Sequence, residues 1–215
     1  MREIAFVEAL NEALHEEMER DEKVFILGED VELAYVFGVT KGLAARFGKD
    51  RVRDTPISEL GFVGAGVGAA MAGYRPVVEI MFLDFIMLAM DPLINQAAKL
   101  RYMLGGQISV PLVVRSPGGG GVQYGPTHSQ CLEAWFMQVP GIKVAVPSDP
   151  ADGKGLLKTA IRDDNPVMFI EHKMLYKLKG PVPEGEHLVP FGQAAVKRPG
   201  ADVTLIGVCY QVVNC

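Results

Sequence analysis

One acidic residue, Glu59, lies in a setting where an ionised carboxylate is costly. It stands among apolar residues in the segment DTPISELGFVGAGVGAAMAG, residues 54–73. A lone carboxylate buried among apolar groups needs a partner. The glycines that follow remove side chains from a helix, so a second backbone or a flat ligand can come close. The pattern therefore indicates a cofactor site at a contact surface, and it fits a packed core helix preceded by a surface glutamate equally well.

A second candidate is His128, which follows the glycine run 118–121. A Walker loop would end in Gly-Lys-Ser/Thr, which does not follow these glycines, so a flap over a site is the favoured interpretation. We expect His128 to begin a helix over residues 128–139. The helix dipole there disfavours imidazolium, so the ring would stay neutral and able to carry a proton. The alternative is a solvent-exposed histidine without a function.

The segments that must position these residues alternate between helix and strand. Helices are expected at residues 4–20, 38–48, 64–73, 84–103 (in two pieces around Pro92), 128–139 and 149–162, and strands at 24–27, 76–82, 110–117, 142–148 and 166–172. The strands are nearly continuous in Val, Ile and Phe, which is typical of a parallel sheet covered on both faces. The predicted fold is therefore an α/β parallel sheet with helices on both faces.

Ligands of such sheets gather at the carboxyl ends of the strands. Glu29, Asp30, residues 82–85, the glycine loop and His128 all follow predicted strands. Glu59 lies on a segment that can reach the same edge. We therefore expect these residues to line one site.

Composition narrows the class of protein. With a net charge of −5, the chain has no excess of basic residues for binding nucleic acid. No window has the uninterrupted apolar length of a membrane span, and no signal peptide is evident at the start. The cysteines, Cys131, Cys209 and Cys215, show no metal or disulfide spacing, which fits a reducing cytoplasm.

The 215 residues divide into a domain and a fragment. We expect an α/β domain at 1–176, and a linker rich in Gly, Pro and charge at 177–201. Residues 202–215 would be the stub of a second domain, largely missing, that begins with an apolar strand at 202–208. One strand cannot form a domain by itself.

Several stretches together form a recognisable pattern. They are ILGEDV (26–31), FGVTKGLAARFG (37–48), the Glu59 segment, EIMFLDF (79–85), DPLINQAAKLRYM (91–103), GPTHSQ (125–130) and PGIKVAVPSDPADGKGLLKTAIRDDNPVMFIEH (140–172). By these stretches the chain resembles the beta subunit of the thiamine diphosphate-dependent component of 2-oxo acid dehydrogenase complexes, the pyruvate, branched-chain and acetoin class. The resemblance runs from residue 1 to about 208.

The resemblance implies a domain that binds the pyrimidine half of thiamine diphosphate. Glu59 matches the carboxylate that hydrogen-bonds pyrimidine N1′, so that the neighbouring 4′ nitrogen can remove the thiazolium C2 proton. Phe85 matches the aromatic residue that packs on the pyrimidine, and Glu29 matches an acid of the same pocket. His128 matches a loop histidine that contacts substrate. Backbone carbonyls match a family potassium site at Leu112, Ala160, Ile161, Asp163 and Asn165.

The resemblance also implies partners. The family's diphosphate and Mg²⁺ motif, GDG, does not occur in the sequence, so a separate alpha subunit would hold both. The expected assembly is a heterotetramer with a second beta subunit, serving a lipoyl acyltransferase core. The expected reaction is oxidative decarboxylation of a small 2-oxo acid, with pyruvate the first choice, and acyl transfer to a lipoyl domain. The isolated chain is expected to be inactive.

Two other classes of function stay open at this point. One is a non-catalytic pyrimidine-domain fragment that dimerises. An acetoin dehydrogenase beta subunit is not a separate class but a close variant of the dehydrogenase hypothesis. The other is a transketolase-like synthase, which is disfavoured because such chains carry both cofactor halves in one polypeptide.

Overall fold

The computed structural model describes residues 1–34 and 36–215. Its centre is a parallel sheet with strand order β3-β2-β4-β5-β7-β6. The strands are β2 (Val24–Gly28), β3 (Val52–Asp54), β4 (Arg75–Glu79), β5 (Val113–Gly118), β6 (Lys143–Ala145) and β7 (Val167–His172). The predicted α/β fold is confirmed.

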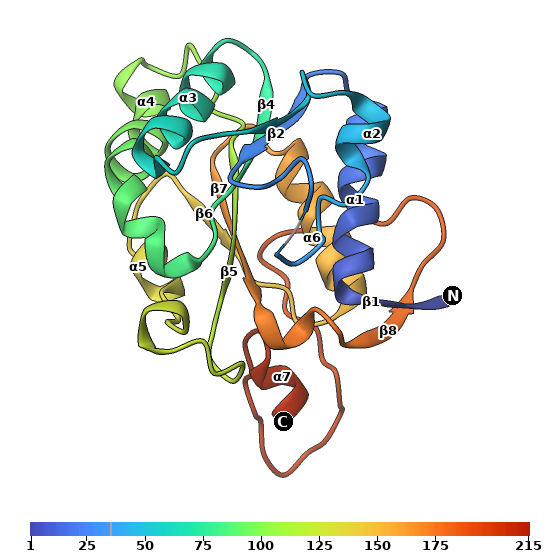
Figure 1. Ribbon diagram of the computed structural model, residues 1–215. Helices are drawn as coiled ribbons and strands as arrows, with labels where there is room; N and C mark the ends of the chain where they lie inside the picture. Colours follow the sequence, from blue (N-terminus) through green and yellow to red (C-terminus); the bar gives the residue numbers. More distant parts are fainter. Residues whose placement is uncertain (35) are drawn as a thin grey trace.

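Helices cover both faces of this sheet (Figure 1). One face carries α1 (Phe6–Arg20), α2 (Leu43–Phe47) and α6 (Pro150–Arg162). The other carries α3 (Glu59–Met71), the 3₁₀-helix η1 (Leu83–Ala89), the π-helix η2 (Asp91–Ala97), α4 (Ala98–Met103) and α5 (Glu133–Met137).

Each face has its own apolar core because successive strand side chains point to opposite faces. Val77 and Val113 belong to the core beneath α1 and α6. Their neighbours Val78 and Val114 belong to the core beneath α3 and η1. The continuous apolar strands seen in the sequence follow from this double coverage.

The remaining elements lie outside the parallel sheet. They are an antiparallel pair of β1 (Arg2–Ala5) and β8 (Lys179–Val182), the short 3₁₀-helices η3 (Pro126–His128) and η4 (Lys173–Leu175), and α7 (Gln211–Asn214). The strand expected at 202–208 does not form, so that prediction is wrong. A strand needs a neighbour to satisfy its backbone groups, and none pairs with this segment in the described chain. The boundaries at 176 and 201 stay predictions, although β8 lies inside the expected linker.

The predicted helix 84–103 forms as three successive pieces, η1, η2 and α4. Pro92 does not separate two helices as expected but stands in the first turn of η2. There its missing N–H is tolerated, because the first amides of a helix have no partner within the helix. No helix of the described residues combines the length and apolar character needed to cross a bilayer.

Helix α3 has one inner and one outer face. Gly66 faces the sheet, where an added Cβ would lie 2.9 Å from Val78 Cγ2. On the outer face, an added Cβ at Gly64 or Gly68 would meet nothing within 4 Å. Leu60 and Met71 are exposed on the same helix. The outer face of α3 therefore has room for a closely packed second subunit. That packing stays a prediction.

Candidate cofactor and substrate site

The sheet brings the predicted site residues to one edge. Glu29 follows β2, Phe85 lies in η1 after β4, and His128 lies in the segment after β5. All these strands are parallel, so their carboxyl ends meet at the same edge. Glu59 joins them because the Thr55 amide donates to the Gly28 carbonyl at 2.9 Å, which ties the start of the β3–α3 connection to the end of β2.

Gly28 is required at the end of β2. An added Cβ there would lie 2.5 Å from the carbonyl oxygen of Glu79 on the adjacent strand β4. The absence of a side chain permits this close approach of two backbones. The turn that leads into Glu29 is thereby held against the sheet.

Glu29 and Glu59 form a pair of neighbouring acids. Glu59 is the first residue of α3 and is only 5% exposed. Burial, then the charges of Glu59 and Asp30, raise the pKa of Glu29 to about 7. Glu29 therefore changes its charge near neutral pH, as expected of a group that exchanges protons.

Two buried polar atoms at this pair have no hydrogen-bond partner in the described part of the chain. They are Glu29 Oε1 and Thr55 Oγ1. Buried polar atoms in folded proteins are nearly always bonded, so such exceptions call for a ligand or water. These two atoms thus suit a polar ring with donor and acceptor atoms, such as an aminopyrimidine.

The raised pKa of Glu29 predicts a pH-dependent stability. The folded protein holds this proton more tightly than the unfolded chain, so the stabilisation is complete below pH 4.5 and is lost as pH rises toward 7. The Glu29→Gln variant of the full-length protein has no such loss. We expect its melting temperature, relative to the parent, to increase from pH 4.5 to pH 8 in scanning calorimetry. Glu22→Gln, at an exposed acid, is the control; a pH-independent difference for Glu29→Gln would contradict the assignment.

Phe85 and His128 meet at the same edge. The His128 ring centroid lies 5.3 Å from that of Phe85 and 4.9 Å from that of Phe82, in edge-on arrangements. Thr127 Oγ1 lies 3.1 Å from His128 Nδ1. The half-buried imidazole therefore packs edge-on against two phenylalanine rings.

The helix expected to begin at His128 does not form there. His128 ends the short η3, and α5 begins only at Glu133. The carbonyls of His128 and Gln130, which a helix would use as acceptors, instead accept from Lys173 Nζ and the Gly119 amide. The helix-dipole argument for a neutral His128 is therefore wrong. The place of His128 after β5, at the carboxyl edge of the sheet, is as expected.

A buried ionic network beside the site was not predicted. Arg115 on β5 is 1% exposed and binds Glu171 on β7 through two hydrogen bonds of 2.7 and 2.8 Å. It also donates to Glu79 on β4, and Tyr176 donates to Glu171 at 2.7 Å. Burial opposes the guanidinium charge, but Glu171 and Glu79 together raise the Arg115 pKa above its usual value.

A signal for this network exists in the sequence. Arg115, Glu79 and Glu171 are each the single charged residue in an otherwise apolar buried stretch. Charged residues are almost never fully buried unless paired. Three such residues on central strands therefore indicate one shared cluster.

The carbonyls assigned to potassium lie at the opposite edge of the sheet, before β5 and β7. Arg75 Nη1 donates to the carbonyls of Ile161 at 3.0 Å and Asp163 at 3.1 Å. The Leu112 and Ala160 carbonyls accept from the amides of Val167 and Asp163. Two of the five groups thus already face a cation, the Arg75 guanidinium, and the potassium site with Leu112, Ala160, Ile161, Asp163 and Asn165 stays a prediction.

Residues 2–179 match the family model of the transketolase pyrimidine-binding domain. The chain belongs to this family. A split-gene transketolase, described as an inactive beta4 tetramer, superposes with a TM-score of 0.63 at 21% identity, over 79% of this chain and 51% of that one. At this identity the likeness supports the fold of the pyrimidine-binding domain.

Relatives of the pyrimidine-binding domain carry names from one enzyme class. A mitochondrial pyruvate dehydrogenase E1 component subunit beta of Dictyostelium discoideum is 49% identical, over 100% of this chain and 62% of the relative. A 2-oxoisovalerate dehydrogenase subunit beta of Bacillus subtilis is 50% identical, over 97% and 65%. An acetoin:2,6-dichlorophenolindophenol oxidoreductase subunit beta of Cupriavidus necator is 48% identical, over 95% and 64%. The resemblance inferred from the motifs is confirmed, and the chain spans less than two thirds of these relatives.

Proposed function

We propose that this pyrimidine-binding domain belongs to the beta subunit of a thiamine diphosphate-dependent 2-oxo acid dehydrogenase. The reaction is oxidative decarboxylation of a small 2-oxo acid, with acyl transfer to the lipoyl domain of an acyltransferase core. The observation that carries the proposal is buried Glu59 beside Glu29, whose Oε1 atom has no partner in the described chain. Named relatives of this class support it.

The residues of the site have separate roles in this proposal. Thiamine diphosphate, when bound, supplies the electron sink for decarboxylation. Glu59 holds a proton at the pyrimidine nitrogen, and its buried setting strengthens that hydrogen bond. Glu29, with a pKa near 7, takes up a proton near neutral pH and so limits repulsion with Glu59. Phe85 packs against the pyrimidine ring.

His128 contacts the substrate in this proposal. His128→Ala in the assembled enzyme should lower kcat by about 10²-fold or more, the usual contribution of a positioned acid–base group. The Kd of thiamine diphosphate should stay unchanged, because the ring faces substrate and not the pyrimidine. Steady-state kinetics and calorimetry measure the two quantities, and His15→Ala, on α1, is the control. Normal kcat at saturation together with a large loss of cofactor affinity would sink this role.

A partner must complete the site. We propose an alpha subunit that holds the diphosphate and Mg²⁺, and a second beta subunit packed through α3, giving a heterotetramer. Relatives include mitochondrial and bacterial proteins, and a cytoplasmic location stays a prediction for this chain.

The full-length protein, coexpressed with an alpha chain that contains a GDG motif, provides the test. Each substrate class of the relatives is supplied in turn: pyruvate, 2-oxoisovalerate and acetoin. We expect thiamine-dependent turnover with pyruvate as the best substrate. Preference for acetoin would favour the hypothesis of an acetoin dehydrogenase beta subunit. No turnover of any of them by a stable complex would favour the non-catalytic fragment.

A further inference from the structure

Two buried charged side chains hold the backbone that carries His128. Asp84 Oδ1 accepts from the amides of Ser129 and Gln130, each at 3.2 Å. Lys173 Nζ donates to the His128 carbonyl. Asp84 is 3% exposed and Lys173 is 5% exposed. Three consecutive loop residues are thus bonded to two ionisable groups from other elements.

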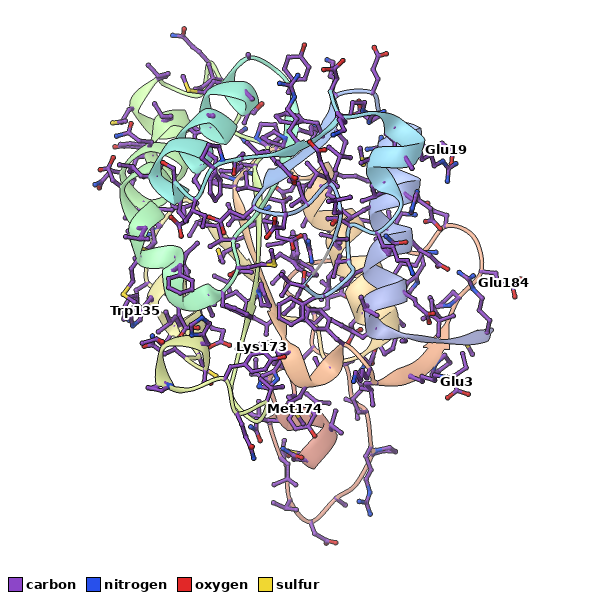
Figure 2. All side chains as sticks on the ribbon, in the orientation of Figure 1. Glu3, Glu19, Trp135, Lys173, Met174 and Glu184 are labelled. Carbon is purple, nitrogen blue, oxygen red and sulfur yellow. The ribbon has the colours of Figure 1, made fainter. Side chains whose placement is uncertain are left out.

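The strand order explains how these groups meet. Strand β5 lies between β4 and β7, so the segment after β5 runs between the segments after those strands. Asp84 comes from η1, after β4, and Lys173 comes from η4, after β7. Figure 2 shows Lys173 at this end of the sheet. Both contacts span 45 positions in the sequence.

Each charge depends on the loop for its bonds. A buried charge is costly unless it is hydrogen-bonded or paired. The Asp84 Oδ1 atom accepts from loop amides, and its Oδ2 atom has no partner in the described residues. Lys173 has the His128 carbonyl and the rings of Phe82 and Tyr124, at 5.0 and 6.0 Å. A loop conformation that broke these bonds would leave both charges buried and unsatisfied.

The same contacts determine where the imidazole lies. Asp84 and Phe85 are neighbours in η1, and Lys173 stands over Phe82. The two charged groups and the two rings that flank His128 therefore form one unit. We propose that Asp84 and Lys173 are positioning residues that hold His128 against Phe82 and Phe85. This inference rests on the proposed contact of His128 with substrate.

The test uses the full-length protein in complex with its alpha chain. Lys173→Met keeps the aliphatic stem and removes the donor, and Asp84→Ala removes the acceptor. We expect amide hydrogen exchange in the 125–132 peptide to accelerate by about tenfold or more in both variants. Turnover should fall toward that of His128→Ala, with the Kd of thiamine diphosphate unchanged. Combining either change with His128→Ala should cause little further loss, because the residues act through one group.

Two controls separate positioning from folding. Asp84→Asn keeps the Oδ1 acceptor and should restore most of the protection, and Lys177→Met removes an exposed lysine four positions away. Exchange in α6 reports whether the fold is intact. Unchanged exchange at 125–132, or faster exchange with normal turnover where His128→Ala is impaired, would overturn the inference. Normal turnover of His128→Ala would instead overturn the proposed role of His128, while the exchange data would still report on the loop.

Discussion

Glu59→Gln leaves the fold intact and removes nearly all turnover of the assembled enzyme. The amide has almost the same shape as the carboxylate and still accepts hydrogen bonds through its oxygen, but it carries no negative charge and exchanges no proton at this site. We expect kcat to fall by at least about 10²–10⁴-fold, the range for loss of a positioned acid–base group. Glu133→Gln, in the first turn of α5, is the matched control.

A second readout of Glu59→Gln does not depend on activity. The Glu59 charge is one of the causes that raise the pKa of Glu29. Its removal should lower the pKa of Glu29, which carbon NMR of the labelled carboxyl measures directly. Near-parental turnover would remove Glu59 from the catalytic role. An unchanged Glu29 pKa would show that the two carboxyl groups do not interact.

Arg115→Met should cause the largest loss of stability. The substitution keeps an apolar stem and leaves the carboxylates of Glu79 and Glu171 buried without their cation. Breaking a buried pair from one side costs about 3–5 kcal/mol, because the remaining charge is uncompensated. Chemical denaturation of the full-length protein measures this difference, and Arg53→Met, at an exposed arginine, is the control.

A triple variant tests the reason for that loss. Combining Arg115→Met with Glu79→Gln and Glu171→Gln removes all three charges together. Neutral replacement of a whole buried network is often far less costly than removal of one member. We therefore expect the triple variant to recover much of the stability. A loss below about 1 kcal/mol in Arg115→Met would mean that the network is not a buried ionic unit.

The central sheet could be predicted because its strands are buried on both faces. Segments such as PVVEIMF and PVMFIEH are apolar at nearly every position, which distinguishes them from half-exposed strands. Strand β3 was missed because its three residues, VRD, carry no such pattern. The β1–β8 pair was missed because two short segments at distant positions gain strand structure only from each other.

The sequence predicted which edge of the sheet the site residues share, but not the contacts between them. Parallel topology places Glu29, Phe85 and His128 together, and their individual roles came from the family resemblance. The predicted conformation around His128 was wrong because the backbone there depends on Lys173, which lies 45 positions away and donates to the His128 carbonyl. Such a long-range contact leaves no local pattern in the sequence.

We expect this chain to hold only the pyrimidine half of a shared cofactor site. Titration calorimetry of thiamine diphosphate with Mg²⁺ tests it on the 215-residue chain, on the alpha chain and on their mixture. Alone, this chain offers stacking worth about 1 kcal/mol and one or two hydrogen bonds to charged groups worth about 1.5–3 kcal/mol each. Their sum is below the roughly 8 kcal/mol of a micromolar complex, even before association entropy is subtracted. We predict weak binding by this chain and tight, Mg²⁺-dependent binding by the mixture. Submicromolar, Mg²⁺-dependent binding by this chain alone would mean that it holds a diphosphate site of its own.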